Sequence, residues 1–74
     1  MVILAFGQIA ELCGSDRLEA DAPDTDSLRA WLHAQYPALR DRTYVIAVDR
    51  KTIAANTSLY SSSVVALLPP FSGG

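Results

Sequence analysis

The two most apolar segments of this 74-residue chain lie at its two ends, and this placement limits the folds available to it. The first segment is 2–6 (VILAF), which shows no helical period and predicts a buried strand. The second is 64–68 (VVALL), which is apolar on both faces and predicts a central strand. Because a chain of this length forms one domain, we expect the two segments to lie side by side and parallel in one sheet.

Shorter patterns between these two segments predict further elements. Residues 17–21 alternate polar and apolar side chains, as in a half-exposed strand, and residues 44–48 have the composition of a third strand. Residues 8–13 have apolar spacing for one or two helical turns, which Gly14 ends. Residues 52–59 are weakly patterned and could hold a very short edge strand.

One longer helix is predicted in the middle of the chain, with Thr25 as its N-cap and Pro37 after its end. Its apolar face consists of Leu28, Trp31, Leu32 and Tyr36. A polar connection, 38–42, follows, and Leu39 is expected to anchor it. A single main helix across one face of a mixed sheet is an α+β architecture.

Composition excludes several classes of function. The net charge is −2 and no run of like charges occurs, so we expect neither a nucleic-acid nor a membrane surface. The start of the chain lacks the basic region and cleavage site of a signal peptide, and no apolar segment is long enough to span a bilayer. Cys13 is the only cysteine and cannot form an internal disulfide, which favours a cytoplasmic location. An apolar content of 50% in so small a domain also suggests that part of the apolar surface faces a partner.

The last six residues differ from everything before them. Pro69 and Pro70 have no backbone N–H and cannot extend a central strand, so we divide the chain into a folded domain, 1–68, and a flexible tail, 69–74. A terminal Gly73-Gly74 could enter a narrow channel and present its carboxylate there. A carboxylate is unreactive toward nucleophiles, so a partner that uses ATP would have to activate it. The alternative is a frayed terminus without a role.

Three blocks of the sequence resemble a known family, the ubiquitin-like β-grasp sulfur carriers, most closely the small subunits of molybdopterin synthase (MoaD). The blocks are 6–14 (FGQIAELCG), which is similar to Phe-Ala-x-x-Arg-Glu-x-x-Gly, the helix starting Thr25-x-x-Leu28-x-x-x-Leu32, and 64–74 (VVALLPPFSGG). The last block is close to the family's Val-Ala-Leu/Phe-Leu/Phe-Pro-Pro-Val-Ser/Thr-Gly-Gly and is the most specific of the three. The resemblance covers essentially the whole chain and implies a β-grasp fold.

The resemblance also implies a mechanism. An adenylyltransferase (MoeB) would use ATP to convert the Gly74 carboxylate into an acyl-adenylate, and a sulfur donor would turn it into a thiocarboxylate. The tail would then insert into the large subunit (MoaE) and donate sulfur to the dithiolene of molybdopterin, in molybdenum cofactor biosynthesis. Gly74 would be the reacting residue, and partners would grip Pro69, Pro70, Phe71, Ser72 and Gly73. The chain itself would bind no cofactor or metal and would not be an enzyme alone, because the active-site groups belong to the large subunit in an expected heterotetramer with two large subunits.

The sequence departs from the family pattern at three places. Ala10 stands where arginine is frequent, and Asp49 stands where asparagine is common after the third strand. Ser61–Ser63 replace an Asp-Gly-Asp turn before the last strand, where glycine would accept a positive φ more easily.

Other functions remain open on the residues alone. The same carrier chemistry could serve another pathway, such as thiamine synthesis, although its carriers usually lack the proline pair. A ubiquitin-like protein modifier and a β-grasp interaction module without covalent chemistry are alternatives of a different class.

Single residues give weaker hypotheses: Cys13 is expected to be a buried small side chain rather than a sulfur relay, and His33 an exposed helix histidine rather than a general base. Asp24 and Asp26 are expected to serve the helix N-terminus rather than a cation.

Overall fold

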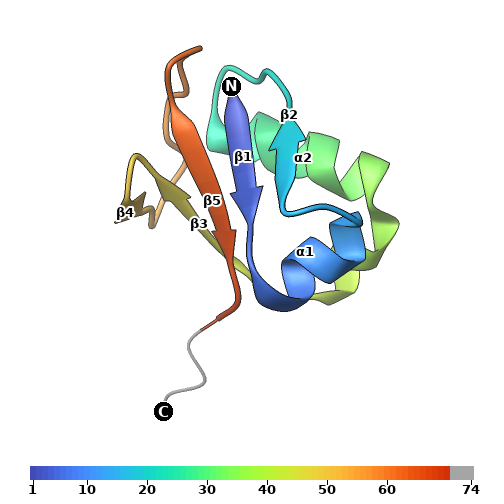
Figure 1. Cartoon of the computed structure of the whole chain (residues 1–74). Coiled ribbons are helices and arrows are strands. Elements are labelled where there is room, and N and C mark those ends of the chain that lie inside the picture. Colours follow the sequence, from blue (N-terminus) through green and yellow to red (C-terminus); the bar gives the residue numbers. More distant parts are fainter. Residues whose placement is uncertain (71–74) are drawn as a thin grey trace.

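The computed structural model describes residues 1–70, and within this range the chain forms one mixed sheet of five strands (Figure 1). The order across the sheet is β2-β1-β5-β3-β4. The strands are β1 (Val2–Ala5), β2 (Arg17–Glu19), β3 (Val45–Val48), β4 (Lys51–Thr52) and β5 (Val64–Leu68).

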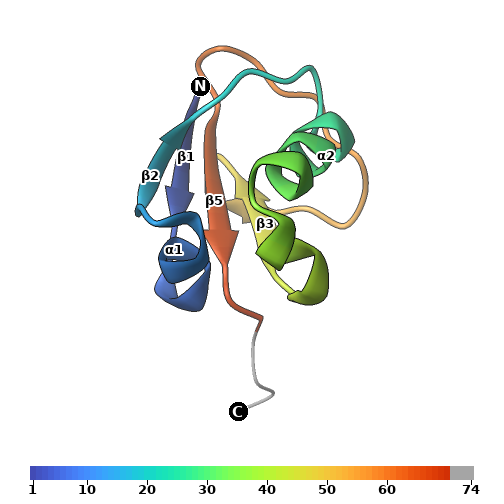
Figure 2. The ribbon, with the colours of Figure 1, turned by 90° about the vertical axis from the view of Figure 1, so that its right-hand side faces the viewer.

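The predicted pairing of the two apolar end segments is confirmed. β1 and β5 are parallel and adjacent, with Ile3 opposite Val65 and Ala5 opposite Leu67. β5 is the middle strand, since β3 pairs antiparallel with its other edge. Both arrows point the same way in Figures 1 and 2, so β5 carries the C-terminal end of the chain out beside the end of β1.

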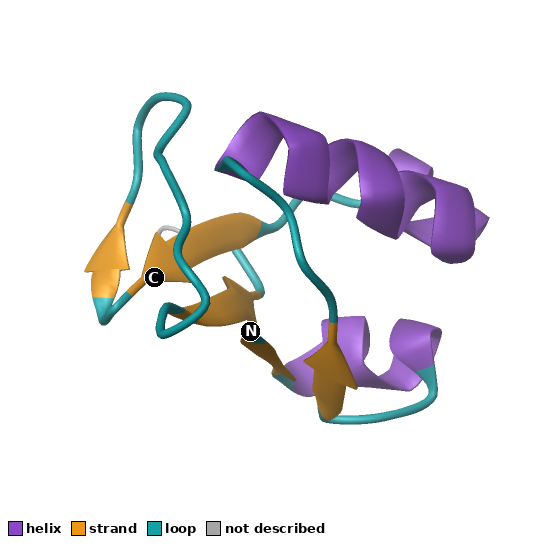
Figure 3. Ribbon diagram, turned by 90° about the horizontal axis from the view of Figure 1, so that it is seen from above, coloured by secondary structure: helices purple, strands orange, loops and turns teal. Residues whose placement is uncertain are grey.

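The helices are α1 (Gly7–Cys13), α2 (Thr25–Gln35) and a 3₁₀ helix, η1 (Pro37–Asp41). α1 and α2 lie on the same side of the sheet (Figure 3). The core between this helix layer and the sheet is apolar and consists of Ile3, Ala5, Ile9, Cys13, Leu18, Leu28, Leu32, Leu39, Ile46, Leu59, Val65 and Leu67. The α+β prediction, with a mixed sheet and one main helix across one face, is confirmed; α1 adds the second, shorter helix.

The predicted N-cap of α2 is wrong by one residue. Asp24 is the N-cap, and its Oδ1 accepts a hydrogen bond of 2.8 Å from the Ser27 N–H. Thr25 lies inside the first turn and is 1% exposed. Its Oγ1 accepts from the Thr57 N–H (2.9 Å) and donates to Asn56 Oδ1 (3.2 Å), so it joins α2 to the distant loop 53–58. Both residues are good capping types, and this long-range pairing decides between them.

Several strands begin or end at other residues than predicted, because a strand can pair only as far as its neighbour extends. β2 stops at Glu19, two residues early, because Glu19 lies opposite Val2 and the next pair, Ala20 and Met1, reaches the first residue of the chain as given. The chain turns at Gly7, which has a φ of +58°, so β1 stops before Phe6. The expected edge strand is β4, which pairs only two residues with β3 and starts one residue before the predicted range.

The connection after α2 is more regular than expected. Pro37 begins the 3₁₀ helix η1, where its missing N–H is not needed, and Leu39 is fully buried as the predicted anchor. No helix among residues 1–70 is both long enough and apolar enough to cross a membrane.

Candidate functional site

The face of the sheet opposite the helices is open and apolar at its centre. In β5, Val65 and Leu67 are fully buried in the core, whereas Val64 is 44% exposed and Ala66 and Leu68 are half-buried. Successive side chains of a strand point to opposite faces, so these three residues belong to the open face. β5 is therefore central in the sheet, as predicted, but residues 1–70 cover only one of its two apolar faces.

The strand register extends this open face across the whole sheet. Ala66 lies opposite Leu4 of β1 on one edge and opposite Ala47 of β3 on the other. Ala47 in turn lies opposite Thr52, and Leu4 lies opposite Arg17. Paired residues share a face, so a single row crosses all five strands with an apolar middle and polar ends.

A groove of about 540 Å³ lies along this row. Its apolar lining consists of Leu4, Phe6, Ala47, Val64, Ala66 and Leu68, and its polar lining of Asp49, Arg50 and Thr52. Phe6 is 45% exposed, although it follows a buried strand. A hollow of about 390 Å³ on the β2 side shares Leu4 and Phe6 and adds Arg17. Phe6 and Val64, two of the three exposed large hydrophobic residues among residues 1–70, thus lie in this groove, while Tyr60 lies elsewhere; such a cluster is typical of a surface that binds a partner.

Two arginines lie at opposite margins of this open face. Arg17 is on β2, and Arg50 is in the β3–β4 turn. Both are exposed, and neither forms an ion pair within residues 1–70. Each arginine has an acidic neighbour that also lines this face, Asp16 beside Arg17 and Asp49 beside Arg50, so both margins of the apolar centre carry charges of both signs.

The turn at Asp49 and Arg50 holds one of these charges in place. Both residues have positive φ, +49° and +72°, which suits the right-handed twist of a two-residue hairpin turn. The Asp49 carboxylate accepts a hydrogen bond of 3.0 Å from the Val64 N–H, and the Asp49 N–H donates to the Val64 carbonyl. An asparagine oxygen could accept the same bond, so this contact does not require the aspartate in place of asparagine.

The base of the tail adjoins the open face. The last ladder bond between β1 and β5 runs from the Phe6 N–H to the Leu67 carbonyl (3.1 Å), and Leu68 lines the groove. Pro69 and Pro70 follow directly and are exposed. Of the six predicted site residues, these two are described by the structure. Phe71, Ser72, Gly73 and Gly74 lie outside the described residues, so their predicted roles stay predictions.

Of the two other departures from the family pattern, the serine turn has a structural explanation and Ala10 has none. Ser61–Ser63 form a turn without any positive φ, so this turn does not need glycine. Ser63 is 4% exposed, and its Oγ accepts a hydrogen bond of 2.9 Å from the Tyr60 N–H. Ala10 is half-buried against the core, and nothing in the structure explains why it replaces arginine.

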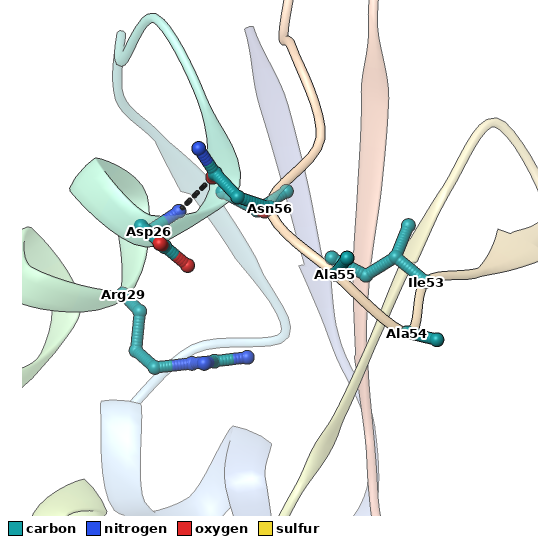
Figure 4. A pocket seen from close by; sticks show the side chains of 7 residues that line it. Asp26, Arg29, Ile53, Ala54, Ala55 and Asn56 are labelled. Atoms are coloured by element: carbon teal, nitrogen blue, oxygen red, sulfur yellow. Dashed lines mark hydrogen bonds between the residues drawn. The ribbon is translucent and has the colours of Figure 1, made fainter.

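A second, smaller hollow lies at the start of α2 (Figure 4). It measures about 210 Å³ and lies between α2 and loop 53–56, with the Arg29 side chain reaching toward it. The first N–H groups of the helix already have partners. Asp26 donates to Asn56 Oδ1 (2.9 Å), Ser27 to Asp24 Oδ1, and Leu28 to the Asp24 carbonyl. The helix N-terminus therefore leaves few backbone donors for an anion, although the Arg29 guanidinium lines the hollow, and the contacts with Asn56 hold the loop on the helix.

Asp24 and Cys13, the candidates for cation binding and sulfur relay, have surroundings that fit a structural role instead. The Ser27 backbone N–H lowers the pKa of Asp24, as expected for a carboxylate at a helix N-terminus. Within residues 1–70 no cluster of three or more metal-binding side chains occurs. Cys13 is 9% exposed in the core, and its burial raises the pKa of the thiol, which opposes a relay role.

His33 differs from its prediction as an exposed residue. It is half-buried, and its Nε2 lies 2.9 Å from the Tyr44 hydroxyl, with the two rings edge to face. A hydrogen-bonded pair of this kind fixes α2 against the segment before β3, and no nucleophile adjoins it in the described hydrogen bonds.

Sequence reasoning missed the open face as a site. The apolar residues at 64, 66 and 68 predict a central strand, but they do not show which of its two faces stays uncovered. The number of predicted helices was the available indication of an uncovered face, because one main helix and one short helix cannot cover both faces of a sheet.

Comparison with known proteins places these features in a family. The sequence model of the ThiS family matches residues 3–74. None of the curated protein sequences matches the chain.

Solved structures share the fold over nearly the full length. One is a Pyrococcus furiosus protein assigned as molybdopterin converting factor subunit 1, with TM-score 0.86, 18% identity and coverage of 93% of this chain and 94% of that chain. Another is small archaeal modifier protein 1 of Methanosarcina acetivorans, with TM-score 0.84, 22% identity and coverage of 99% and 94%. A third is a chain of the complex of subunits 1 and 2 of the molybdopterin-converting factor of Helicobacter pylori, with TM-score 0.74, 28% identity and coverage of 99% and 96%.

The first two likenesses establish the ubiquitin-like β-grasp fold, and the family match extends over almost every residue of the chain. The chain therefore belongs to the ThiS family and is a small ubiquitin-like sulfur carrier of the ThiS/MoaD type.

Proposed function

We propose that this protein is the small subunit of a molybdopterin synthase, and that Gly74 carries the sulfur. An activating enzyme of the MoeB type joins the Gly74 carboxylate to AMP and releases pyrophosphate from ATP. Hydrosulfide or an equivalent sulfur donor then displaces AMP and leaves a terminal thiocarboxylate. The large subunit, of the MoaE type, receives the tail, and two such sulfurs build the dithiolene.

The observation that carries this proposal is the position of the tail base at the rim of the apolar groove. Leu68 is both the last residue of β5 and part of the groove lining, and Pro69 follows it. A partner that covers the groove therefore lies next to the point where the tail leaves the domain. A carrier needs this arrangement, because the same partner must hold the domain and act on its terminus.

The charges of the open face indicate what such a partner offers. Leu4, Ala66 and Ala47 form the apolar centre, and Arg17 and Arg50 flank it. Asp16 and Asp49 lie beside these arginines, so the complementary surface is an apolar patch with polar or charged groups at each end. Complementary rim charges of this kind speed association and fix orientation more than they add affinity.

The choice of pathway rests on the proline pair and on one comparison. The Leu67-Leu68-Pro69-Pro70 block resembles the molybdopterin synthase small subunits more than the thiamine carriers. The Helicobacter pylori relative, 28% identical, is a subunit of a complex with subunit 2 of its factor. The same partnership here would give a heterotetramer with two large subunits. With its single cysteine reduced, the protein would act in the cytoplasm.

Intact-mass spectrometry tests the proposal directly. The chain is incubated with the MoeB-type enzyme, MgATP and sodium sulfide, and we expect a mass gain equal to replacing one oxygen by sulfur, located at Gly74. Deletion of Gly74 is expected to abolish this gain while thermal unfolding stays unchanged, because the residue comes six positions after the last strand, β5, in the sequence. An unchanged mass of the full chain with active enzyme would refute the carrier role.

A second step separates the pathways. The thiocarboxylated chain is mixed with the MoaE-type subunit and its pterin precursor, and formation of the dithiolene product is expected. A charged chain that supplies no sulfur there would contradict the molybdopterin assignment. Isopeptide bonds between Gly74 and lysines of other proteins would identify a modifier instead.

A further inference from the structure

The turn between β1 and α1 lies directly against the first residue of the tail. Gly7 has a φ of +58°, and a Cβ on it would lie 3.1 Å from Cγ and 4.0 Å from Cδ of Pro69. The distance of 3.1 Å is shorter than ordinary van der Waals contact, whereas 4.0 Å is ordinary. Any side chain at position 7 would therefore push the proline ring away by a few tenths of an ångström, and Gly7 avoids this shift.

Neighbouring bonds hold both sides of this contact. The Phe6 N–H donates to the Leu67 carbonyl (3.1 Å), which fixes the chain one residue before Gly7 to the chain two residues before Pro69. The Ile9 N–H donates to the Phe6 carbonyl (3.1 Å) and closes the turn on the other side. The position of Gly7 relative to β5 is therefore determined by the sheet and by α1.

Because the ring of Pro69 is rigid, this contact restricts the direction in which the chain continues. Its φ is restricted to about −65°, and it has no N–H with which to continue pairing. With the ring against Gly7, the rotation of the Leu68–Pro69 segment about its remaining torsion is limited. A preset direction reduces the ordering that a partner must impose on the tail.

We propose that Gly7 is a positioning residue for sulfur transfer: with Pro69 it forms a seat that sets the direction in which the tail leaves the groove. The proposal rests on the proposed function, because direction matters only if a partner acts on the terminus. Gly7 touches no reacting atom and acts through Pro69.

The chain contains a matched control for backbone strain. Gly14 has a φ of +74°, and a Cβ there would meet nothing within 4 Å. Gly14→Ala therefore introduces left-handed strain without a clash, whereas Gly7→Ala introduces both strain and a clash with Pro69. The difference between the two variants isolates the seat.

Steady-state activation kinetics test the seat, with the MoeB-type enzyme, MgATP and sodium sulfide. We expect Gly7→Ala to lower kcat by about tenfold, since a displacement of about 1 Å in a reacting group can cost a hundredfold. KM should stay within about twofold, because the open face that docks on the enzyme is unchanged. Gly14→Ala should keep both constants within about twofold.

A double variant links the effect to Pro69. In a Pro69→Ala background the ring is absent, so adding Gly7→Ala should lower kcat by no more than about twofold. Pro69→Ala alone should lower kcat, and this variant tests the seat even if Gly7→Ala does not fold, since Pro69 lies beyond the last strand. Circular dichroism melts confirm that each variant is folded at the assay temperature.

The outcomes separate this inference from the function on which it rests. A wild-type chain that gains no sulfur refutes the proposed function. A wild-type chain that gains sulfur while Gly7→Ala behaves like Gly14→Ala refutes the seat alone. Equal losses from Gly7→Ala in the wild-type and Pro69→Ala backgrounds also refute it, and so does an unchanged kcat for Pro69→Ala.

Discussion

Ala66→Asp is the substitution that separates docking from folding most clearly. Ala66 lies in the middle of the row that crosses the open face, with Leu4 on one side and Ala47 on the other. Its side chain points away from the helices, so a carboxylate there stays in water in the free protein. In a docked complex the same carboxylate is enclosed between apolar groups.

The expected effects differ in size between the free and docked states. In the free protein the cost is the lower strand propensity of aspartate, about 1 kcal/mol or less, which lowers Tm by roughly 4–8 °C. In the complex, an unpaired buried charge costs about 3–5 kcal/mol. Arg17 and Arg50 at the margins offset part of this, so we expect a loss of about 2–4 kcal/mol, or roughly 30- to 900-fold in Kd.

Titration calorimetry against the MoaE-type and MoeB-type partners measures this loss. Ala30→Asp is the control, since it makes the same chemical change at an exposed position of α2, on the opposite side of the sheet. It should leave Kd within about twofold. If Ala66→Asp binds both partners as tightly as Ala30→Asp does, the open face is not the docking surface.

Three further predictions concern stability and reactivity. Thr25→Val leaves the Thr57 N–H without its acceptor and should cost about 2 kcal/mol, seen as a fall in Tm of roughly 8–16 °C; an unchanged Tm would show that water replaces the hydroxyl. Asp24 has a lowered pKa in the folded state, so its contribution to stability is present above about pH 4 and is lost as pH falls through the lowered value. Asp24→Asn keeps a capping oxygen but does not titrate, so urea unfolding should be near wild type at neutral pH and less sensitive to acid below about pH 4; equal acid sensitivity would contradict the cap assignment. Cys13 should react with iodoacetamide at least about tenfold more slowly in the folded chain than in urea, because burial raises the pKa of its thiol, and equal rates would show that the core opens readily.

The open face and the tail seat predict different kinetic signatures. Ala66→Asp removes binding that is equal in ground and transition states, so KM should rise while kcat is kept. Gly7→Ala leaves docking intact and disturbs only the direction of the tail, so kcat should fall while KM is kept. Measuring both variants with one activating enzyme therefore tests whether docking and delivery are separate properties of this fold.

The features that the sequence predicted well depend on the pattern of side chains within single segments of the chain. The apolar segments 2–6 and 64–68 were recognisable as adjacent central strands because a continuous apolar run is typical of a strand in the middle of a sheet. The helix starting near residue 25 followed from apolar spacing, and the proline pair marked the end of pairing.

The tertiary structure decided what depends on residues far apart in the chain. Asp24 rather than Thr25 caps α2 because Thr25 bonds Thr57, thirty-two residues away. Gly7 meets Pro69 only because β1 and β5 end side by side. The sequence alone determined that β5 is apolar on both faces, but which face stays uncovered depends on where the two helices pack, and that is set by the whole core rather than by any one segment.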